Sequence, residues 1–208
     1  TSRRICPESS RARLTTGAAY AAHVRAPTVI EIVDDPRHAA EIATLAAATF
    51  PLACPPHSTT ADIAEHIREH LQPANFDHHI TSADSDVVVA RDGIEGPVIG
   101  YSLVLHTAPV HPDVAAVVTQ RPVTEISKMY VAPDHHARGL TEAPSHMLMQ
   151  TALEVSRSRG SVLAWLGVNQ ENERAQRFYT KMGFARAGVK TFDLNGSVEH
   201  DFIFVQQL

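Results

Sequence analysis

The chain has 208 residues, of which 44% are hydrophobic and 20% charged; this is the composition of one globular domain and argues against a disordered chain. The formal net charge of -5 at pH 7 provides no basic field, so no nucleic-acid partner is expected. The longest apolar run falls well short of the ~20 residues of a membrane helix, and no membrane span is expected. The two cysteines, Cys6 and Cys54, cannot form a disulfide framework and favour a cytoplasmic location.

Residues 1–27 carry five arginines against a single acid, among serine, threonine and alanine. This composition resembles a transit peptide, but chain ends of this kind are more often a loosely packed tail. We therefore expect a tail over residues 1–27 and one domain over residues 28–208.

Apolar periodicity and capping residues place the elements of that domain in chain order. Asp35 and Pro36 begin the first helix, and Ser58 or Thr59 caps the second. The order of strands and helices predicts a mixed α/β sheet, with a parallel pair where strands and helices alternate. Expected strands are 28–33, 86–91, 98–106, 123–131, 161–168, 184–194 and 200–206; expected helices are 36–50, 60–71, 141–159 and 172–182; and residues 77–86 and 106–120 are expected to be loops.

The segment MYVAPDHHARGLTEA, residues 129–143, predicts a strand end, a turn and a helix start. Arg138 and Gly139 stand at the mouth of that helix. Unpaired N–H groups and the helix dipole favour an anion there, so the turn suits a phosphate. The alternative is an ordinary strand–helix turn that uses glycine for its backbone freedom.

The segment WLGVNQENERAQRFYTKMGF, residues 165–184, predicts a strand followed by a helix. Asn172, Ala175 and Tyr179 lie at helical spacing, and Gly183 ends the helix. Taken alone, Tyr179 would be a core aromatic whose hydroxyl finds a local partner.

Together the two segments resemble the GNAT superfamily of acetyl-CoA-dependent N-acetyltransferases. The second matches the signature N-x-x-A-x-x-F-Y-x-x-x-G-F in full, and the resemblance extends over residues 28–208. The C-terminal residues 189–208 resemble the branch that contains bacterial polyamine acetyltransferases. The resemblance implies a GNAT-like fold, in which a mostly antiparallel sheet flanked by helices contains one splayed parallel strand pair.

The first segment departs from the family pattern at four positions. His136 replaces glutamine or arginine, Ala137 and Thr141 replace small loop residues, and Pro144 stands where the helix should already run. Since proline fits the first turn of a helix, we expect Thr141 to be the N-cap. These departures bear on the affinity for acetyl-CoA more than on its identity.

The resemblance implies roles for several residues. Glu125 would be the base that deprotonates the amine, and Tyr179 the acid that protonates the departing thiolate. Because successive side chains of a strand point to opposite faces, Glu125, Ser127 and Met129 are expected to share one face of the strand. The other position used for a base in the family corresponds to Gly167, which has no side chain. Acetyl-CoA would be held by backbone N–H groups near Met129, Tyr130 and Val131, by the loop residues Ala137, Arg138, Gly139, Leu140, Thr141 and Glu142, and by Asn172.

The acceptor implied is a primary amine of a polyamine, a protein lysine or a small molecule. The segments around residues 60–71, 77–86 and 106–120 would wall its pocket, and acids there, Asp86 among them, would suit a cation. Neither a metal nor a membrane partner is expected, and a homodimer is left open.

Two other interpretations remain. His66, Glu69 and His70 match the inverted zinc-protease motif H-x-x-E-H, which would make the protein a zinc-dependent hydrolase, although thirteen histidines make a chance match unsurprising. The altered loop would also fit a catalytically inactive coenzyme A-binding or protein-interaction module.

Overall fold

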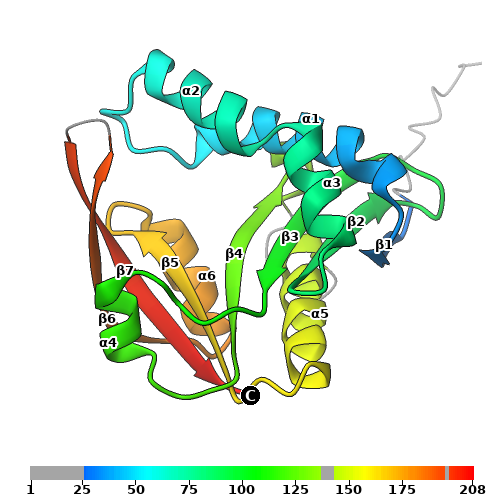
Figure 1. The fold of residues 1–208 in the computed structure, drawn as a ribbon. Helices are drawn as coiled ribbons and strands as arrows, with labels where there is room; N and C mark the ends of the chain where they lie inside the picture. The colour runs from blue at the N-terminus through cyan, green and yellow to red at the C-terminus, as the bar shows by residue number, and fades with distance from the viewer. Residues whose placement is uncertain (1–25, 137–142, 195–196) are drawn as a thin grey trace, which may run out of the picture.

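The computed structural model describes residues 26–136, 143–194 and 197–208, so most of the expected tail and residues 137–142 of the loop lie outside it. Within the described residues, seven strands form one sheet in the order β1-β2-β3-β4-β5-β7-β6 (Figure 1). Neighbouring strands are antiparallel except β4 and β5, which are parallel, and the expected mixed sheet is confirmed. The strands are β1 (Thr28–Val33), β2 (Ser85–Asp92), β3 (Val98–Leu105), β4 (Val123–Val131), β5 (Leu163–Asn169), β6 (Ala185–Leu194) and β7 (Ser197–Gln207).

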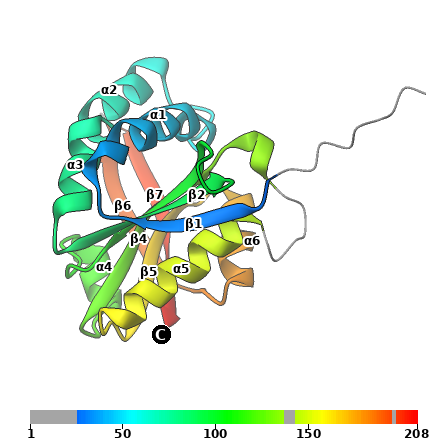
Figure 2. The same ribbon diagram turned by 90° about the vertical axis from the view of Figure 1, so that its right-hand side faces the viewer.

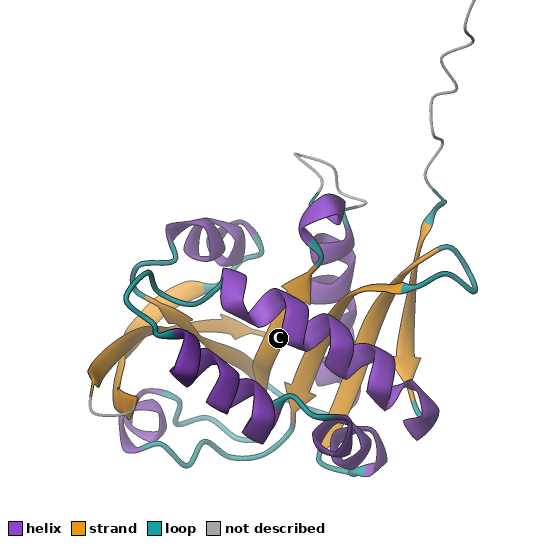
Figure 3. Ribbon diagram, turned by 90° about the horizontal axis from the view of Figure 1, so that it is seen from above, coloured by secondary structure: helices purple, strands orange, loops and turns teal. Residues whose placement is uncertain are grey.

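Helices cover both faces of the sheet. Helices α1, α2 and α3 lie on one face, and α5 and α6 lie on the other, as Figures 2 and 3 show from two directions. The short α4 packs against β6. The helices of the described residues are α1 (Ala39–Thr49), α2 (Thr60–His70), α3 (Pro73–Thr81), α4 (Pro112–Val117), α5 (Pro144–Ser158) and α6 (Glu173–Lys181).

Side-chain caps fix where several helices begin. The Asp35 side chain accepts a hydrogen bond from the Arg37 backbone N–H at 2.9 Å, which starts the 3-10 turn that leads into α1. Thr59, and not Ser58, caps α2 by accepting from the Asp62 N–H at 3.2 Å. Each cap satisfies an N–H group that the helix itself leaves unpaired.

Two segments expected to be loops contain helices. The α3 helix has Pro73 in its first turn and a reciprocal cap between Gln72 and Asn75, and it buries Phe76 and Ile80 one turn apart. The α4 helix spans six residues, too few for an apolar period to be visible in the sequence. In both cases tertiary burial selects a helix where the local pattern is short.

The start of α5 also differs from expectation. Pro144 is in the first turn, as its chemistry requires, but Ala143 stands at the N-cap position instead of Thr141. The Ala143 side chain makes no capping hydrogen bond, so the sequence rule for a polar cap fails at this helix.

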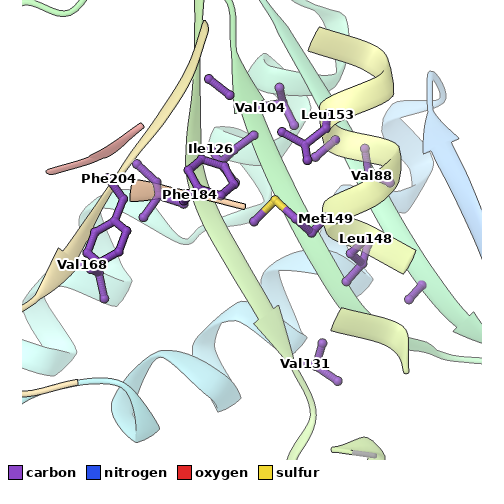
Figure 4. Packing of buried hydrophobic residues seen from close by; sticks show 14 of the residues in the cluster. Val88, Val104, Ile126, Val131, Leu148, Met149, Leu153, Val168, Phe184 and Phe204 are labelled. Carbon is purple, nitrogen blue, oxygen red and sulfur yellow. The ribbon is translucent and has the colours of Figure 1, made fainter. Parts of the chain in front are cut away.

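The main core lies between the sheet and the pair α5 and α6. Met149 and Leu153 of α5 face Ile126 of β4, with Phe184 and Phe204 beside them (Figure 4). A second cluster between α1, α3 and the opposite face of β2 and β3 is centred on the buried rings of Phe76 and Tyr101.

The parallel seam between β4 and β5 is paired over only part of its length. In these fully described strands, pairing joins Val123 to Leu163, Thr124 to Ala164 and Glu125 to Trp165, and then ends. Beyond Glu125 the two strands diverge (Figure 1). Because alternate backbone N–H groups of a strand point to either neighbour, those of β4 that point toward β5 beyond Glu125 have no strand partner.

A β-bulge in β4 changes which side chains share a face. Leu103 of β3 is opposite Lys128 and Val104 is opposite Ile126, so Ser127 is the extra residue. The expectation that Glu125, Ser127 and Met129 share a face by period two is therefore wrong. The bulge turns Lys128 toward the face of Glu125, while Met129 packs against the core below α5.

Candidate active site

Glu125 is the last residue of β4 that pairs with β5, and it stands at the point where the strands separate. Its side chain is half-buried on the face covered by α1 to α3. Burial raises the pKa of the Glu125 carboxyl above its ordinary value, and the nearby ammonium groups of Lys190 and Lys128 partly offset this. A carboxylate with a raised pKa at this position has the chemistry of a general base.

Lys128 lies on the same face as Glu125 because of the bulge. Burial lowers the pKa of its ammonium group, and the negative charge of Glu125 opposes that shift. Tyr130 is next on this face; its ring stacks on Tyr101 with centroids 5.7 Å apart, and burial raises the pKa of its hydroxyl strongly. The expected cofactor-binding residues of β4 are thus divided, since Tyr130 faces α1 to α3 while Met129 and Val131 contact the other core.

Tyr179 lies on α6, on the opposite side of the sheet from Glu125. Its ring packs edge-on against Phe178 and Phe184. Burial of the hydroxyl raises its pKa to about 12, so it stays protonated at neutral pH and can donate a proton. Tyr179 also packs against the core cluster that contains Val131 of β4 and Val168 of β5, both beyond the last β4–β5 pair.

Asn172 begins α6, where its Oδ1 accepts a hydrogen bond from the Ala175 N–H at 3.0 Å. The same residue lines a cleft of about 190 Å³ between the end of β5 and the loop that follows α1. Cys54 lines the opposite wall, where burial raises the pKa of its thiol. The structure therefore gives Asn172 a capping role and a position beside a cleft. The residues that line the cleft are Leu52, Ala53, Cys54, Pro55, Pro56, Asn169, Glu171 and Asn172.

The expected phosphate-binding residues Ala137, Arg138, Gly139, Leu140, Thr141 and Glu142 lie outside the described residues. The two flanks of that loop are described. His136 donates from Nε2 to the Val131 carbonyl at 2.8 Å, and Pro144 is buried at the start of α5. The loop therefore leaves from the open end of β4 and returns to the first turn of α5.

The β6–β7 hairpin contributes charged residues that the sequence interpretation did not include. Lys190 and Asp201 are opposite each other on β6 and β7, with 3.3 Å between Nζ and Oδ2. Farther along β7, the buried Glu199 accepts a hydrogen bond of 2.6 Å from His57, in the loop before α2. This contact joins the hairpin to that loop (Figure 1). No local pattern indicated these pairs, because each joins segments that only the folded sheet brings together.

Asp86 does not contribute to this site. Its carboxylate accepts hydrogen bonds from His106 at 2.7 Å and from Arg159 at 2.9 Å, near the paired end of the seam. The Nδ1 atom of His106 is hydrogen-bonded to the Thr124 hydroxyl at 3.0 Å, and the Thr124 hydroxyl is hydrogen-bonded to the Ser161 hydroxyl at 2.7 Å. Asp86 is therefore part of a buried polar chain that joins β2, β3, β4 and the start of β5.

The residues of the zinc-protease motif lie on α2. The His66 ring stacks on Phe50 at 4.2 Å, and burial lowers the pKa of His66 to about 4. Glu69 is exposed and contacts Arg68 at 3.5 Å. Across the described part of the chain, no group of three or more His, Cys, Asp or Glu side chains is arranged to hold a metal ion. The hydrolase interpretation therefore has no third protein ligand in these residues.

Comparisons with known proteins identify the family. The model of the Acetyltransferase (GNAT) family matches residues 39–184. An uncharacterized N-acetyltransferase of Mycobacterium tuberculosis is 36% identical over 168 residues, covering 81% of this chain and 96% of the relative. Streptothricin acetyltransferase of Streptomyces lavendulae is 33% identical over 107 residues, or 51% of this chain and 48% of that protein.

The fold agrees with this assignment. The crystal structure of the PaiA N-acetyltransferase from Thermoplasma acidophilum in complex with coenzyme A superimposes with a TM-score of 0.64 at 19% identity, covering 86% of this chain and 99% of that one. No helix in the described residues is long and apolar enough to span a membrane.

The family model matches more than half of this chain, the signature on α6 is complete, and the parallel seam is only partly paired. The chain therefore belongs to the GNAT family of N-acetyltransferases.

Proposed function

We propose that the protein transfers the acetyl group of acetyl-CoA to a primary amine by direct attack within a ternary complex. The observation that carries the proposal is the β4–β5 seam, which opens at Glu125; Tyr179 packs against the core cluster that contains Val131 and Val168 of the open part. Such an opening leaves backbone donors of β4 without a strand partner, and these suit the amide and carbonyl groups of the co-substrate.

The described residues divide the chemistry between two sides of the sheet. An alkylamine has a pKa near ~10.4, so it arrives protonated, and presenting it as the free base at pH 7 costs about 4–5 kcal/mol. Glu125 accepts the proton of the ammonium group, and the amine nitrogen then forms a bond to the acetyl carbon. As the carbon–sulfur bond breaks, the Tyr179 hydroxyl donates its proton to the sulfur. The nitrogen loses its second proton to become the neutral amide, and this proton returns to the Tyr179 phenolate by way of solvent, so that one proton is released overall, from Glu125. A backbone N–H of the open part of β4 stabilises the negative charge that develops on the acetyl oxygen.

The places of residues 137–142 and of Asn172 in the fold suggest the remaining contacts to acetyl-CoA. Residues 137–142 connect the open end of β4 to the first turn of α5, which suits them to hold the diphosphate. Asn172, beside the cleft at the end of β5, suits the pantetheine or the amine. Streptothricin acetyltransferase among the relatives supports a small-molecule amine as one acceptor class to test.

The test is an acceptor screen that follows release of free thiol from acetyl-CoA. Polyamines, lysyl peptides and amine-bearing antibiotics are compared side by side, with saturating acetyl-CoA. Thiol release that depends on one class of amine, with a matching acetylated product by mass spectrometry, is the expected result. Tight binding of coenzyme A with no turnover of any amine would contradict the proposal and favour the inactive binding module.

A further inference from the structure

Gly167 marks an exposed position on an otherwise buried strand. It lies on β5, two residues beyond the last pair with β4, and it is exposed while Leu166 and Val168 on either side are buried. It has no side chain to cover the sheet at this point. The exposed backbone therefore lies just beyond the point where the β4–β5 seam opens.

A carboxylate occupies part of the space that a side chain would fill. A Cβ placed on Gly167 would be 3.3 Å from Asp201 Oδ2 and 3.5 Å from Lys190 Nζ. Asp201 is on the neighbouring strand β7, and its side chain is 16% exposed. Position 167 of β5 has no side chain of its own, and the structure brings the Asp201 carboxylate to it from β7.

The Asp201 carboxylate can accept further hydrogen bonds. Among the described residues, Lys190 is the side chain that lies within ion-pair distance of Asp201, through Oδ2, and a carboxylate can accept about four hydrogen bonds. The other charged or titratable groups near it are Glu199 on the same strand, Tyr130 on β4 and, through Lys190, Glu125. Burial raises the pKa of Asp201 in spite of Lys190, so the charge of the carboxylate is incompletely compensated.

We propose that Asp201 binds the positively charged ammonium group of the acceptor beside Gly167, and that it thereby selects acceptors that arrive as cations. This inference rests on the proposed acetyl transfer. Lys190 contacts Oδ2, the oxygen that lies beside Gly167, and this oxygen can accept a second hydrogen bond from the ammonium group of the acceptor. Asp201 is then a specificity-determining residue that acts before Glu125 removes the proton.

Two acceptors of similar size separate this role from a structural one. Benzylamine is protonated at pH 7 and aniline is neutral, and each is measured as an acceptor or, if it is not acetylated, as a competitive inhibitor of the best acceptor from the screen. In Asp201→Asn we expect the KM or inhibition constant of benzylamine to rise about 10- to 100-fold, which is the loss of one charge-assisted hydrogen bond. The constant for aniline and the KM of acetyl-CoA stay unchanged.

Two further variants serve as a matched control and as a smaller perturbation of the same site. Glu199→Gln is the matched control, because Glu199 is a carboxylate on the same strand that His57 already binds, and it should leave both constants unchanged. Gly167→Ala keeps the charge of Asp201 but forces its carboxylate to move by a few tenths of an ångström. It should raise the KM or inhibition constant of benzylamine, by less than Asp201→Asn does. The thermal midpoint of each variant reports whether it folds.

Equal losses for benzylamine and aniline in Asp201→Asn, or an equal loss in Glu199→Gln, would overturn the role of Asp201 and leave acetyl transfer intact. Wild-type protein that acetylates no amine in the screen would instead overturn the proposed function, and this inference with it.

Discussion

The two ends of the β4–β5 seam differ in almost every physical respect. At the paired end, residues 123–125 and 163–165 join through ladder pairs and pack on a buried cluster that contains Trp165 and Ile203. At the open end, which begins at Glu125, residues 126–131 and 166–169 lack that pairing, and the charged side chains of Glu125 and Lys128 lie on one face. The same two strands thus provide stability where they pair and chemistry where they separate, because an unpaired, polar opening costs stability that the paired end supplies.

The largest expected effect is at the open end. Glu125→Gln should lower kcat about 10²- to 10⁴-fold, since it removes the proposed base. The raised pKa of Glu125 means that wild-type activity rises with pH as the carboxyl ionises; the variant loses this rise, and its optimum moves toward the pKa of the acceptor. Rate–pH profiles measure both. Glu154→Gln, at an exposed position of α5, is the control, and an unchanged profile in Glu125→Gln would show that another group is the base.

At the paired end the expected effect is on stability. Trp165→Ala should lower the free energy of unfolding by about 3–5 kcal/mol, because it leaves a cavity in a cluster whose members are almost fully buried. Denaturant unfolding measures the change, and Val162→Ala at an exposed neighbouring position should stay within about 0.5 kcal/mol of wild type. A loss below about 1 kcal/mol in Trp165→Ala would mean that the paired end does not supply the stability assigned to it.

A smaller effect is expected at Tyr179. Tyr179→Phe keeps the ring and its packing but removes the proton donor, so kcat should fall about 10²-fold with little change in the affinity for coenzyme A. With a pKa of about 12, the wild-type hydroxyl is protonated across pH 6 to 10, and the loss should be uniform over that range. Steady-state kinetics and coenzyme titration separate the two quantities. Wild-type turnover in the variant would remove Tyr179 from the mechanism.

The smallest effect concerns the buried chain at the paired end. Hydrogen bonds from His106 and then Arg159 hold the pKa of Asp86 below its ordinary value, so its contribution to stability is present above about pH 4 and is lost as the pH falls through the lowered pKa. Asp86→Asn should cost about 1–2 kcal/mol at pH 7 and progressively less below pH 4. Unfolding curves at several pH values test this against Asp84→Asn, an exposed neighbour. A constant difference at every pH would argue against the Asp86 charge as its source.

Local features of the sequence predicted much of the fold. The caps at Asp35 and Thr59 and the strand patterns predicted most elements to within a few residues, because capping and alternation act over one or two turns. The signature on α6 likewise indicated the family before the fold was known. The short helices α3 and α4 escaped prediction, since their formation depends on burial of a few side chains by distant elements.

By itself, the sequence determined most of the elements and the sheet class, because these follow from interactions between residues close along the chain, and its signature on α6 indicated the family. The tertiary structure decided the content of the site. The bulge at Ser127 reverses which residues share the face of Glu125, and its position is set by pairing with β3. The Lys190–Asp201 pair reaches Gly167 because β6, β7 and β5 lie side by side in the sheet. Strand pairing between distant segments is a property of the whole sheet, and no local pattern specifies it.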